Sequence, residues 1–395
     1  MISPSSLILL IFIVILLTGT PIGTALGVAS IFPIWYYNYG VSVVAPNFYG
    51  NIAKFPLLAI PFFVFAGVTM ERAGVAERIV KFIKALVGWL PGGLAIATVL
   101  IGTFWGAVSG SGPATAAAIG IILIPYLTGA GYGKAFSAAL VATVAGLSII
   151  IPPSVAYIIY GTILNVSIGA LFIAGIIPGL ILGAVLSIVA FLVSLKKGFK
   201  GIEKPSLKEV WISFKESVLG LLAPVIILGG IYAGVFTPTE AAVIAVAYSL
   251  FLGLVVYRKI TFKDVVKILA DSTEVSSVVM FVVAFAGLFS WAEQTAGLVE
   301  ASVGWVLGLT REPLFVMLLF MTVLLFAGMF LDAISIYYIF LPIMLPIINH
   351  FNWDLIWFGV LMTINLAIGQ VTPPVAVNAY VTSKISGAKL EEIGK

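Results

Sequence analysis

The sequence predicts an all-α polytopic membrane protein built from two inverted repeats, each with a re-entrant helical hairpin and a helix broken at a Pro-Pro pair. Three observations predict this class: a mean hydropathy of +1.21, an internal repeat, and basic residues that gather on one side of the apolar segments. Only 9% of the 395 residues are charged, whereas average soluble domains are about 25% charged. A water-soluble globular protein is therefore excluded.

The apolar segments are long enough to cross the hydrocarbon core of a lipid bilayer, which takes about 20 residues of helix. They cover residues 4–19, 20–38, 54–71, 90–109, 111–128, 132–165, 168–195, 218–236, 238–257, 272–292, 313–331, 332–349 and 353–385. No Lys or Arg precedes the first segment and no cleavage site follows it, so we expect a retained membrane segment rather than a signal peptide. Segments 74–88 and 260–271 alternate apolar and charged residues, which is typical of helices at a membrane interface. Thr237–Glu240 predicts a capping box.

A repeat at a nearly constant offset organises these segments. The matched pairs are Thr20-Pro21 with Thr237-Pro238, Phe65-Ala66-Gly67 with Phe285-Ala286-Gly287, Pro125 with Pro346, and Pro152-Pro153 with Pro373-Pro374. We therefore expect a first repeat over residues 1–165 and a second over residues 218–395. Residues 166–217 form the connecting helix and a basic linker.

Each repeat contains a pair of shorter apolar segments followed by a long segment interrupted at Pro-Pro. We interpret the pairs as re-entrant hairpins, at about 90–128 and 313–349, and the long segments as broken helices, at 132–165 and 353–385. Each repeat then crosses the membrane four times. Because the connecting helix adds one crossing, the second repeat starts from the opposite face and the repeats are inverted.

The basic residues test this topology. Of the 20 Lys and Arg residues, all but Lys54 and Arg311 fall on one face, which the positive-inside rule makes cytoplasmic. The N-terminus is then outside and the C-terminus inside. Since the basic residues lie in short loops rather than on one folded surface, no nucleic-acid partner is expected.

Several kinds of chemistry are excluded by composition. The chain has no Cys and one His, which excludes disulfides, thiol nucleophiles and Cys/His zinc sites. Gly133-Lys134 is not a nucleotide-binding loop, because Thr128 and Ala135 occupy positions that require Gly and Ser or Thr. We therefore expect no enzyme. His350 is interpreted as a solvated loop residue.

The stretch Ser109–Thr115 joins the two arms of the first hairpin with the sequence Ser-Gly-Ser-Gly-Pro-Ala-Thr. Gly adopts turn conformations closed to other residues, and a break at membrane depth is tolerated only where it is buried in protein or lines a wet cavity. The exposed carbonyl and hydroxyl oxygens are suited to a hard cation such as Na⁺. Tight packing of small residues is the structural alternative.

The Pro-Pro pairs lie in Ile151–Ser154 and Thr372–Val375. Two successive prolines remove two backbone donors, and the half-helix that follows points its positive end into the membrane, where it attracts an anion. A single Pro commonly causes only a kink. Two breaks at equivalent positions of a repeat instead indicate a solute site.

Asp332 lies at the tip of the second hairpin, aligned with Ser111 of the first. A carboxylate at membrane depth costs at least about 2.5–3.5 kcal/mol and normally has a partner. The Lys residues in the membrane segments lie at or near segment ends, and none is near Asp332 in the sequence, which leaves a bound cation or an N-capping role for the second hairpin arm. Glu293 is a weaker candidate, near the outer interface.

These motifs resemble those of the large membrane subunit of tripartite ATP-independent periplasmic (TRAP) transporters. The resemblance extends over nearly the whole chain, through Ile60–Gly67, Ser109–Gly120, Ile151–Gly161, Phe236–Ala242, Phe330–Pro346 and Asn365–Asn378. It implies a permease of the bacterial inner membrane that imports a small carboxylate by an elevator mechanism coupled to Na⁺. It also implies two partners, a small four-helix membrane subunit and a periplasmic substrate-binding protein.

The resemblance also implies site residues. One Na⁺ site would use Ser109, Ser111, Gly146 and Pro152, and a second would use Asp332, Thr372 and Pro373. Ser154 and Asn378, which follow the breaks, would face the solute.

Two alternatives stay open. A self-sufficient Na⁺/dicarboxylate-type carrier of the related two-hairpin class would need no soluble receptor. A channel or an intramembrane enzyme is more remote, because a single Asp suggests no pore-lining ring and no second membrane Asp or paired His accompanies it.

Overall fold

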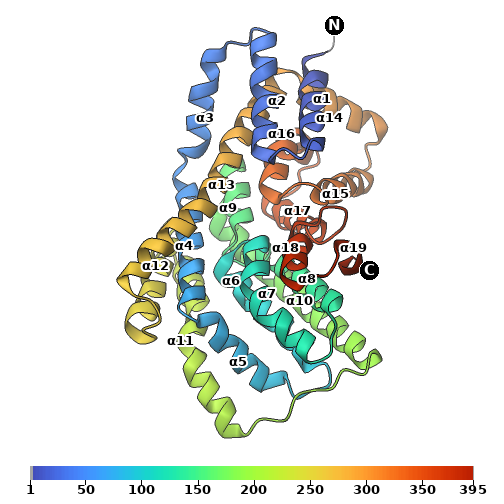
Figure 1. Ribbon diagram of the computed structural model, residues 1–395. Helices are drawn as coiled ribbons and strands as arrows, with labels where there is room; N and C mark the ends of the chain where they lie inside the picture. Colours follow the sequence, from blue (N-terminus) through green and yellow to red (C-terminus); the bar gives the residue numbers. More distant parts are fainter. Residues whose placement is uncertain (1–2, 395) are drawn as a thin grey trace.

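The computed structural model describes residues 3–394, and all the regular structure in that range is helical (Figure 1). This confirms the all-α prediction. Seven helices in this range are long and apolar enough to cross a membrane. They are Phe55–Arg72, Gly112–Gly129, Ile168–Lys196, Leu207–Tyr232, Pro238–Val256, Phe262–Thr295 and Ala333–His350.

The helices fall into two series joined by one long helix, α10 (Ile168–Lys196). The first series is α1 (Pro4–Leu17), α2 (Ile22–Tyr36), α3 (Val44–Ile52), α4 (Ala59–Arg72), α5 (Val75–Val87), α6 (Gly93–Ser109), α7 (Gly112–Gly129), α8 (Lys134–Gly146) and α9 (Val155–Leu164). The second is α11 (Leu207–Tyr232), α12 (Pro238–Phe251), α13 (Phe262–Thr295), α14 (Leu298–Leu309), α15 (Pro313–Gly328), α16 (Ala333–His350), α17 (Leu355–Gly369) and α18 (Val377–Ser386), followed by the short α19 (Leu390–Ile393).

The two series repeat the same order of elements. Helices α3 and α4 together correspond to the single long α13, and α5 corresponds to α14, since each of this pair follows a Gly with positive φ, Gly74 at 71° and Gly297 at 73°. Figure 1 shows α5 toward the lower end of the molecule and α14 toward the upper end. The repeats are therefore inverted, as predicted.

Two helix starts, one whole helix and the position of His350 differ from the sequence expectation. Residues 260–271 form no separate interfacial helix but are the start of α13, because Thr261 and Asp264 build a capping box there. Helix α11 begins at Leu207, inside the expected linker, where Ser206 and Glu209 build another. Helix α14 was not predicted at all. His350 is the last residue of α16 rather than a loop residue.

In the outer part of the molecule, helices of one repeat pack on helices of the other. Helix α2 packs on α13 and α4 packs on α12. Small residues permit the close approach: a Cβ at Gly23 or Gly27 of α2 would lie 2.7 Å from a Cδ1 atom of Phe281 or Phe285 in α13. The predicted capping box of α12 is confirmed, with the Thr237 N–H donating to Glu240 Oε2 at 2.8 Å.

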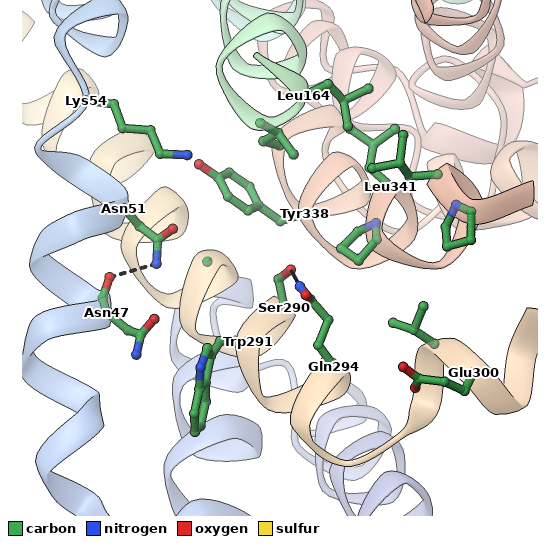
Figure 2. Close-up of a pocket in the computed structure, with 16 residues that line it drawn as sticks. Asn47, Asn51, Lys54, Leu164, Ser290, Trp291, Gln294, Glu300, Tyr338 and Leu341 are labelled. Atoms are coloured by element: carbon green, nitrogen blue, oxygen red, sulfur yellow. Dashed lines mark hydrogen bonds between the residues drawn. The ribbon is translucent and has the colours of Figure 1, made fainter. Parts of the chain in front are cut away.

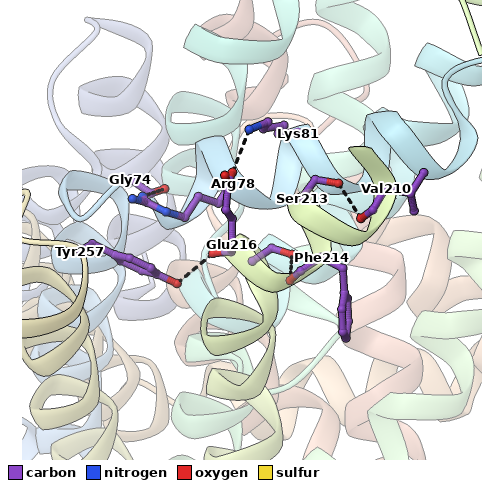
Figure 3. A network of polar contacts seen from close by, with 9 residues as sticks. Gly74, Arg78, Lys81, Val210, Ser213, Phe214, Glu216 and Tyr257 are labelled. Atoms are coloured by element: carbon purple, nitrogen blue, oxygen red, sulfur yellow. Dashed lines mark hydrogen bonds and ion pairs between the residues drawn. The ribbon is translucent and has the colours of Figure 1, made fainter. Parts of the chain in front are cut away.

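Helix α5 is tied to α11 by a polar network (Figure 3). The Lys81 ammonium lies 2.8 Å from a carboxylate oxygen of Glu216, and the Tyr257 hydroxyl donates to the Glu216 carbonyl at 3.3 Å. The Arg78 guanidinium lies 3.8 Å from the centre of the Tyr257 ring. Because an exposed pair stabilises by only about 0–1 kcal/mol, this network chiefly orients α5.

The hairpins and broken helices form the interlocked inner part. Hairpin α6–α7 packs on α8, α7 packs on α18 of the other repeat, and hairpin arm α15 packs on α17. The last contact brings two backbones together, because a Cβ at Gly369 would lie 2.7 Å from the Gly328 Cα. Both Pro-Pro bonds, Pro152-Pro153 and Pro373-Pro374, are cis.

We expect Gly369→Ala to lower the melting temperature by several degrees, because the added methyl meets backbone that cannot rotate away and such overpacking costs about 1–3 kcal/mol. The matched control is Gly304→Ala in α14, where nothing lies within 4 Å of the new Cβ. The control gains about 0.5–1 kcal/mol from helix propensity. Thermal unfolding of the purified protein measures both, and equal melting temperatures would contradict the close contact.

Candidate functional site

Each hairpin turns at a tip whose conformation follows from its sequence. In the first, α6 ends at Ser109, Gly110 takes a positive φ of 65°, and Ser111 is the extended N-cap of α7. In the second, Asp332 occupies the equivalent N-cap of α16, and its Oδ2 accepts the Ile334 N–H at 2.9 Å. The predicted capping role of Asp332 is confirmed.

The two broken helices also turn at polar caps or strained residues. After the first Pro-Pro pair, Ser154 caps α9: its hydroxyl donates to the Ile149 carbonyl at 2.6 Å and accepts the Tyr157 N–H at 3.4 Å. After the second pair, Ala376 caps α18 with a positive φ of 49°. Non-Gly residues rarely adopt this conformation, so surrounding contacts must hold it.

Those contacts come from the hairpin tip of the same repeat. The Val155 N–H donates to the Gly110 carbonyl at 3.1 Å in the first repeat. In the second repeat, the N–H groups of Val375 and Ala376 donate to the Met329 carbonyl at 3.2 and 3.3 Å. In each repeat, the hairpin tip thus accepts hydrogen bonds from the backbone N–H groups at the helix break. Such pairing is required inside a membrane, where no water is present to bond these groups.

The first tip also meets the second break. A Cβ at Gly112 would lie 2.6 Å from Gln370 Oε1 and 2.8 Å from Asn378 Oδ1, so only Gly fits there. Gln370 Oε1, both amide atoms of Asn378 and the Thr115 Oγ1 are buried and have no hydrogen-bond partner among residues 3–394. Leaving a buried polar group unpaired costs about 1–3 kcal/mol. Such a cluster, contributed by both repeats, is suited to a cation or to a polar group of a solute.

A small cavity of about 110 Å³ lies against the first tip. It lies between the hairpins on one side and α4 and α13 on the other, and a Cβ at Gly67 of α4 would be in van der Waals contact with the Ser109 Cα, at 3.8 Å. Ser109 donates to the Ser111 carbonyl at 3.5 Å. The lining includes Phe63, Gly67, Glu71, Trp105, Ser109 and Ser111, with Val155 and Ile334 from the two later elements.

The other expected site residues lie as follows. Gly146 ends α8, where its Cβ would be 3.2 Å from the Ala367 carbonyl oxygen of α17. Pro152 is buried, and Pro373 is exposed. Thr372 donates to the Ile368 carbonyl at 2.7 Å, and no hydrogen bond within residues 3–394 joins it to Asp332, whose Oδ1 accepts from the Ser335 hydroxyl at 2.5 Å.

Gln370 was not predicted as a site residue, and Thr115 was named only as the last residue of the first-tip stretch. Gln370 had a usable signal, because an amide in an apolar run just before a Pro-Pro pair is costly unless it has a function. Thr115 had none, since a Thr in a helix commonly bonds its own backbone. Glu293 is fully buried with both carboxylate oxygens unpartnered, and it lines neither this cavity nor the larger one described below.

Two inverted repeats with paired hairpin tips and paired helix breaks define a membrane transporter of the inverted-repeat class. The family model described as "Tripartite ATP-independent periplasmic transporter, DctM component" matches residues 9–395. The chain therefore belongs to this family of TRAP transporter large permeases.

Relatives span most of the chain. It is 41% identical to the C4-dicarboxylate TRAP transporter large permease protein DctM of Pseudomonas aeruginosa, over 89% of this chain and 82% of that protein. It is 37% identical to the sialic acid TRAP transporter large permease protein SiaM of Vibrio cholerae, over 94% and 87%. It is 38% identical to the isethionate TRAP transporter permease protein DctMQ of Oleidesulfovibrio alaskensis over 97% of its own length, but spans only 61% of that protein.

The fold also has a solved counterpart. The YdaH transporter of Alcanivorax borkumensis superimposes with a TM-score of 0.59, covering 99% of this chain and 93% of that one at 14% identity. This similarity supports the two-hairpin inverted-repeat fold.

We expect Asn378→Leu to leave the melting temperature unchanged or to raise it, because it removes a buried amide without partners, while transport is lost. The matched control is Asn365→Leu in α17, which loses the bond from Asn365 Nδ2 to the Met321 carbonyl at 2.8 Å and should lower the melting temperature. Thermal unfolding and uptake into proteoliposomes measure the two effects. If Asn378→Leu destabilises as much as Asn365→Leu, the Asn378 amide is structural.

Proposed function

We propose that this chain is the large permease subunit of a Na⁺-coupled TRAP transporter that imports an organic acid delivered by a periplasmic binding protein, by an elevator mechanism. One observation carries the proposal: the amide oxygens of Gln370 and Asn378, which have no hydrogen-bond partner among residues 3–394, lie beside Gly112 at the first hairpin tip, and the unpartnered Thr115 hydroxyl lies in the first turn of the same helix. A buried cluster of this kind, formed by both repeats, has the composition of a solute and ion site.

For Na⁺, the support is the chemistry of the two tips. Ser109, Ser111, Gly146 and Pro152 supply hydroxyl and carbonyl oxygens for one site around the first break. Asp332, Thr372 and Pro373 supply a carboxylate, a hydroxyl and carbonyl oxygens for the other. Asp332 has hydrogen-bond donors but no cationic side chain within salt-bridge distance among residues 3–394, and Na⁺ would balance its charge.

For the solute, the support comes from helix ends and from relatives. Ser154 and Asn378 lie at the N-termini of α9 and α18, which carry partial positive charge and attract anions. The names of the relatives mention C4-dicarboxylate, sialic acid and isethionate, all of which are acids. The proposed solute is accordingly a small organic acid, held between the two tips.

The elevator movement is supported by the small cavity, which has the hairpin tips on one side and helices α4 and α13 on the other. A body made of both hairpins and both broken helices would slide along this surface. The small subunit and the binding protein are proposed partners, since the family description names a tripartite periplasmic system. We further propose an inner-membrane location with the N-terminus outside and the C-terminus in the cytoplasm.

The test of Na⁺ coupling uses two hairpin-tip variants. Asp332→Asn keeps a capping oxygen but removes the charge, and Ser111→Ala removes one hydroxyl. Each variant should lower Na⁺-driven uptake by at least about 100-fold. This is the effect expected for loss of a buried charge-assisted ligand worth about 3 kcal/mol. Thr128→Ala is the matched control, because Thr128 bonds only carbonyls of its own helix. Uptake of radiolabelled succinate, sialic acid and isethionate is followed in proteoliposomes that contain both membrane subunits, with the binding protein outside. Unchanged Na⁺ dependence in both variants would disprove the assignment.

The alternative of a self-sufficient carrier is tested with the same vesicles. We expect no uptake when the binding protein or the small subunit is omitted, because the family description is of a tripartite system. Na⁺-driven uptake by this chain alone would favour the self-sufficient carrier.

A further inference from the structure

A second and larger cavity, of about 480 Å³, lies away from the hairpin tips (Figure 2). Its walls come from α3 and the residues that follow it, from the end of α9, and from α13, α14 and α16. The volume is in the range of sites that bind small molecules. Its polar lining includes Asn47, Asn51, Lys54, Ser290, Gln294 and Tyr338.

The two cavities occupy equivalent positions in the two repeats. Gly67 and Glu71 of α4 line the small cavity, and Gly287 and Trp291 of α13 line the large one. Each pair is related by the same offset of 220 residues as the matched Phe-Ala-Gly stretches. Because the repeats are inverted, the two cavities face opposite sides of the membrane, and the large one lies on the side of Lys54.

Lys54 gives the large cavity a positive charge. It is partly buried, and its ammonium has only a long contact, 3.5 Å, with the carbonyl of Thr162 in the last turns of α9. The salt bridges within residues 3–394 join other residues, Arg72 with Asp271 and Lys81 with Glu216.

Tyr338 gives the cavity an unused donor. Its side chain is 3% exposed, and its hydroxyl is buried without a hydrogen-bond partner. Figure 2 shows this hydroxyl pointing toward the Lys54 ammonium. Ser290 adds a second hydroxyl, which accepts from Gln294 Nε2 at 3.2 Å and keeps its own hydrogen free to donate. Glu300 is the acidic residue of the lining, and Figure 2 places it at the opposite end of the cavity.

We propose that this cavity is a second binding site for a small organic anion, with Lys54 and Tyr338 contacting its acid group and Ser290 donating from the facing wall. This proposal rests on the proposed function, because both assume that the transported solute is an organic acid. The site holds the solute on the Lys54 side of the membrane, apart from the hairpin tips. An acid group there also offers the Lys54 ammonium a better partner than the Thr162 carbonyl.

The charge of the cavity can be measured without transport. Because the sequence has no Cys, Asn47→Cys places a single thiol on the cavity wall, and its labelling rates with anionic and cationic methanethiosulfonate reagents report the local potential. Adding Lys54→Gln should lower the anionic-to-cationic rate ratio at least about fivefold, as expected for loss of a unit charge from the lining of the same cavity in a medium of intermediate dielectric. Lys54→Arg should preserve the ratio. Arg311→Gln is the matched control, because Arg311 is the other basic residue expected on this side of the membrane. Arg311 is exposed and does not line the cavity, so this variant should leave the ratio unchanged.

Occupancy is measured on the same single-Cys protein. Succinate, sialic acid or isethionate should slow labelling, and Tyr338→Phe should weaken that protection about threefold, the effect of one lost hydrogen bond, without changing the charge ratio. A ratio that is insensitive to Lys54→Gln, or no protection by any of the three acids, overturns the proposal. Protection by phosphatidylglycerol alone also overturns it, since the site would then hold a lipid headgroup. None of these labelling measurements depends on Na⁺ or on partner proteins. The second binding site can therefore be disproved while Na⁺-driven uptake is observed, and Na⁺-driven uptake can be absent while the second site is confirmed.

Discussion

The structure depends on one constraint, the need to pair backbone groups where helices are interrupted inside a membrane. Four interruptions, two hairpin tips and two Pro-Pro breaks, would each expose carbonyl and N–H groups to hydrocarbon. They are instead paired locally: the Gly110 carbonyl accepts from Val155, and the Met329 carbonyl accepts from Val375 and Ala376. Because each tip supplies the acceptor for its own break, tip and break must move as one body.

The pairing also decides where polar chemistry can occur. With the backbone of both breaks satisfied, Gln370 and Asn378 are among the buried side chains of residues 3–394 whose amide atoms lack hydrogen-bond partners, and both lie where the first tip meets the second break. Gly112 is what permits this meeting, since any Cβ would occupy the space of the two amides. The polar cluster around Gly112 is therefore formed by both repeats.

Much of this was predictable from the sequence, because the signals are local. Pro-Pro pairs, Gly-rich tips and capping boxes act through a few neighbouring residues, so the offset between repeats located the breaks and aligned Ser111 with Asp332. Helix boundaries were less predictable where polar residues begin a long helix. Hydropathy predicts a segment that begins at residue 272, whereas α13 begins ten residues earlier, at Phe262, where Thr261 forms the capping box.

The contacts between repeats were not predictable, because nothing local encodes them. In the sequence, Gln370 is an isolated amide in an apolar segment. Only the structure shows that it lies beside Gly112, which belongs to the other half of the chain. Lys54 likewise appeared only as one of two basic residues on the sparsely charged face. Its place in a cavity beside Tyr338 depends on α16 packing against α13.

Helix α13 has a consequence of its own. It is one unbroken rod of 34 residues, whereas its counterpart in the first repeat is divided between α3 and α4. Val275 and Val279 of this rod line the cavity at the hairpin tip, and Gly287 and Gln294 line the cavity of Lys54. At about 1.5 Å of rise per residue, the two linings are separated by between about 12 and 28 Å along the helix axis. Because an unbroken helix does not shorten, the continuity of α13 fixes the distance between the two cavities.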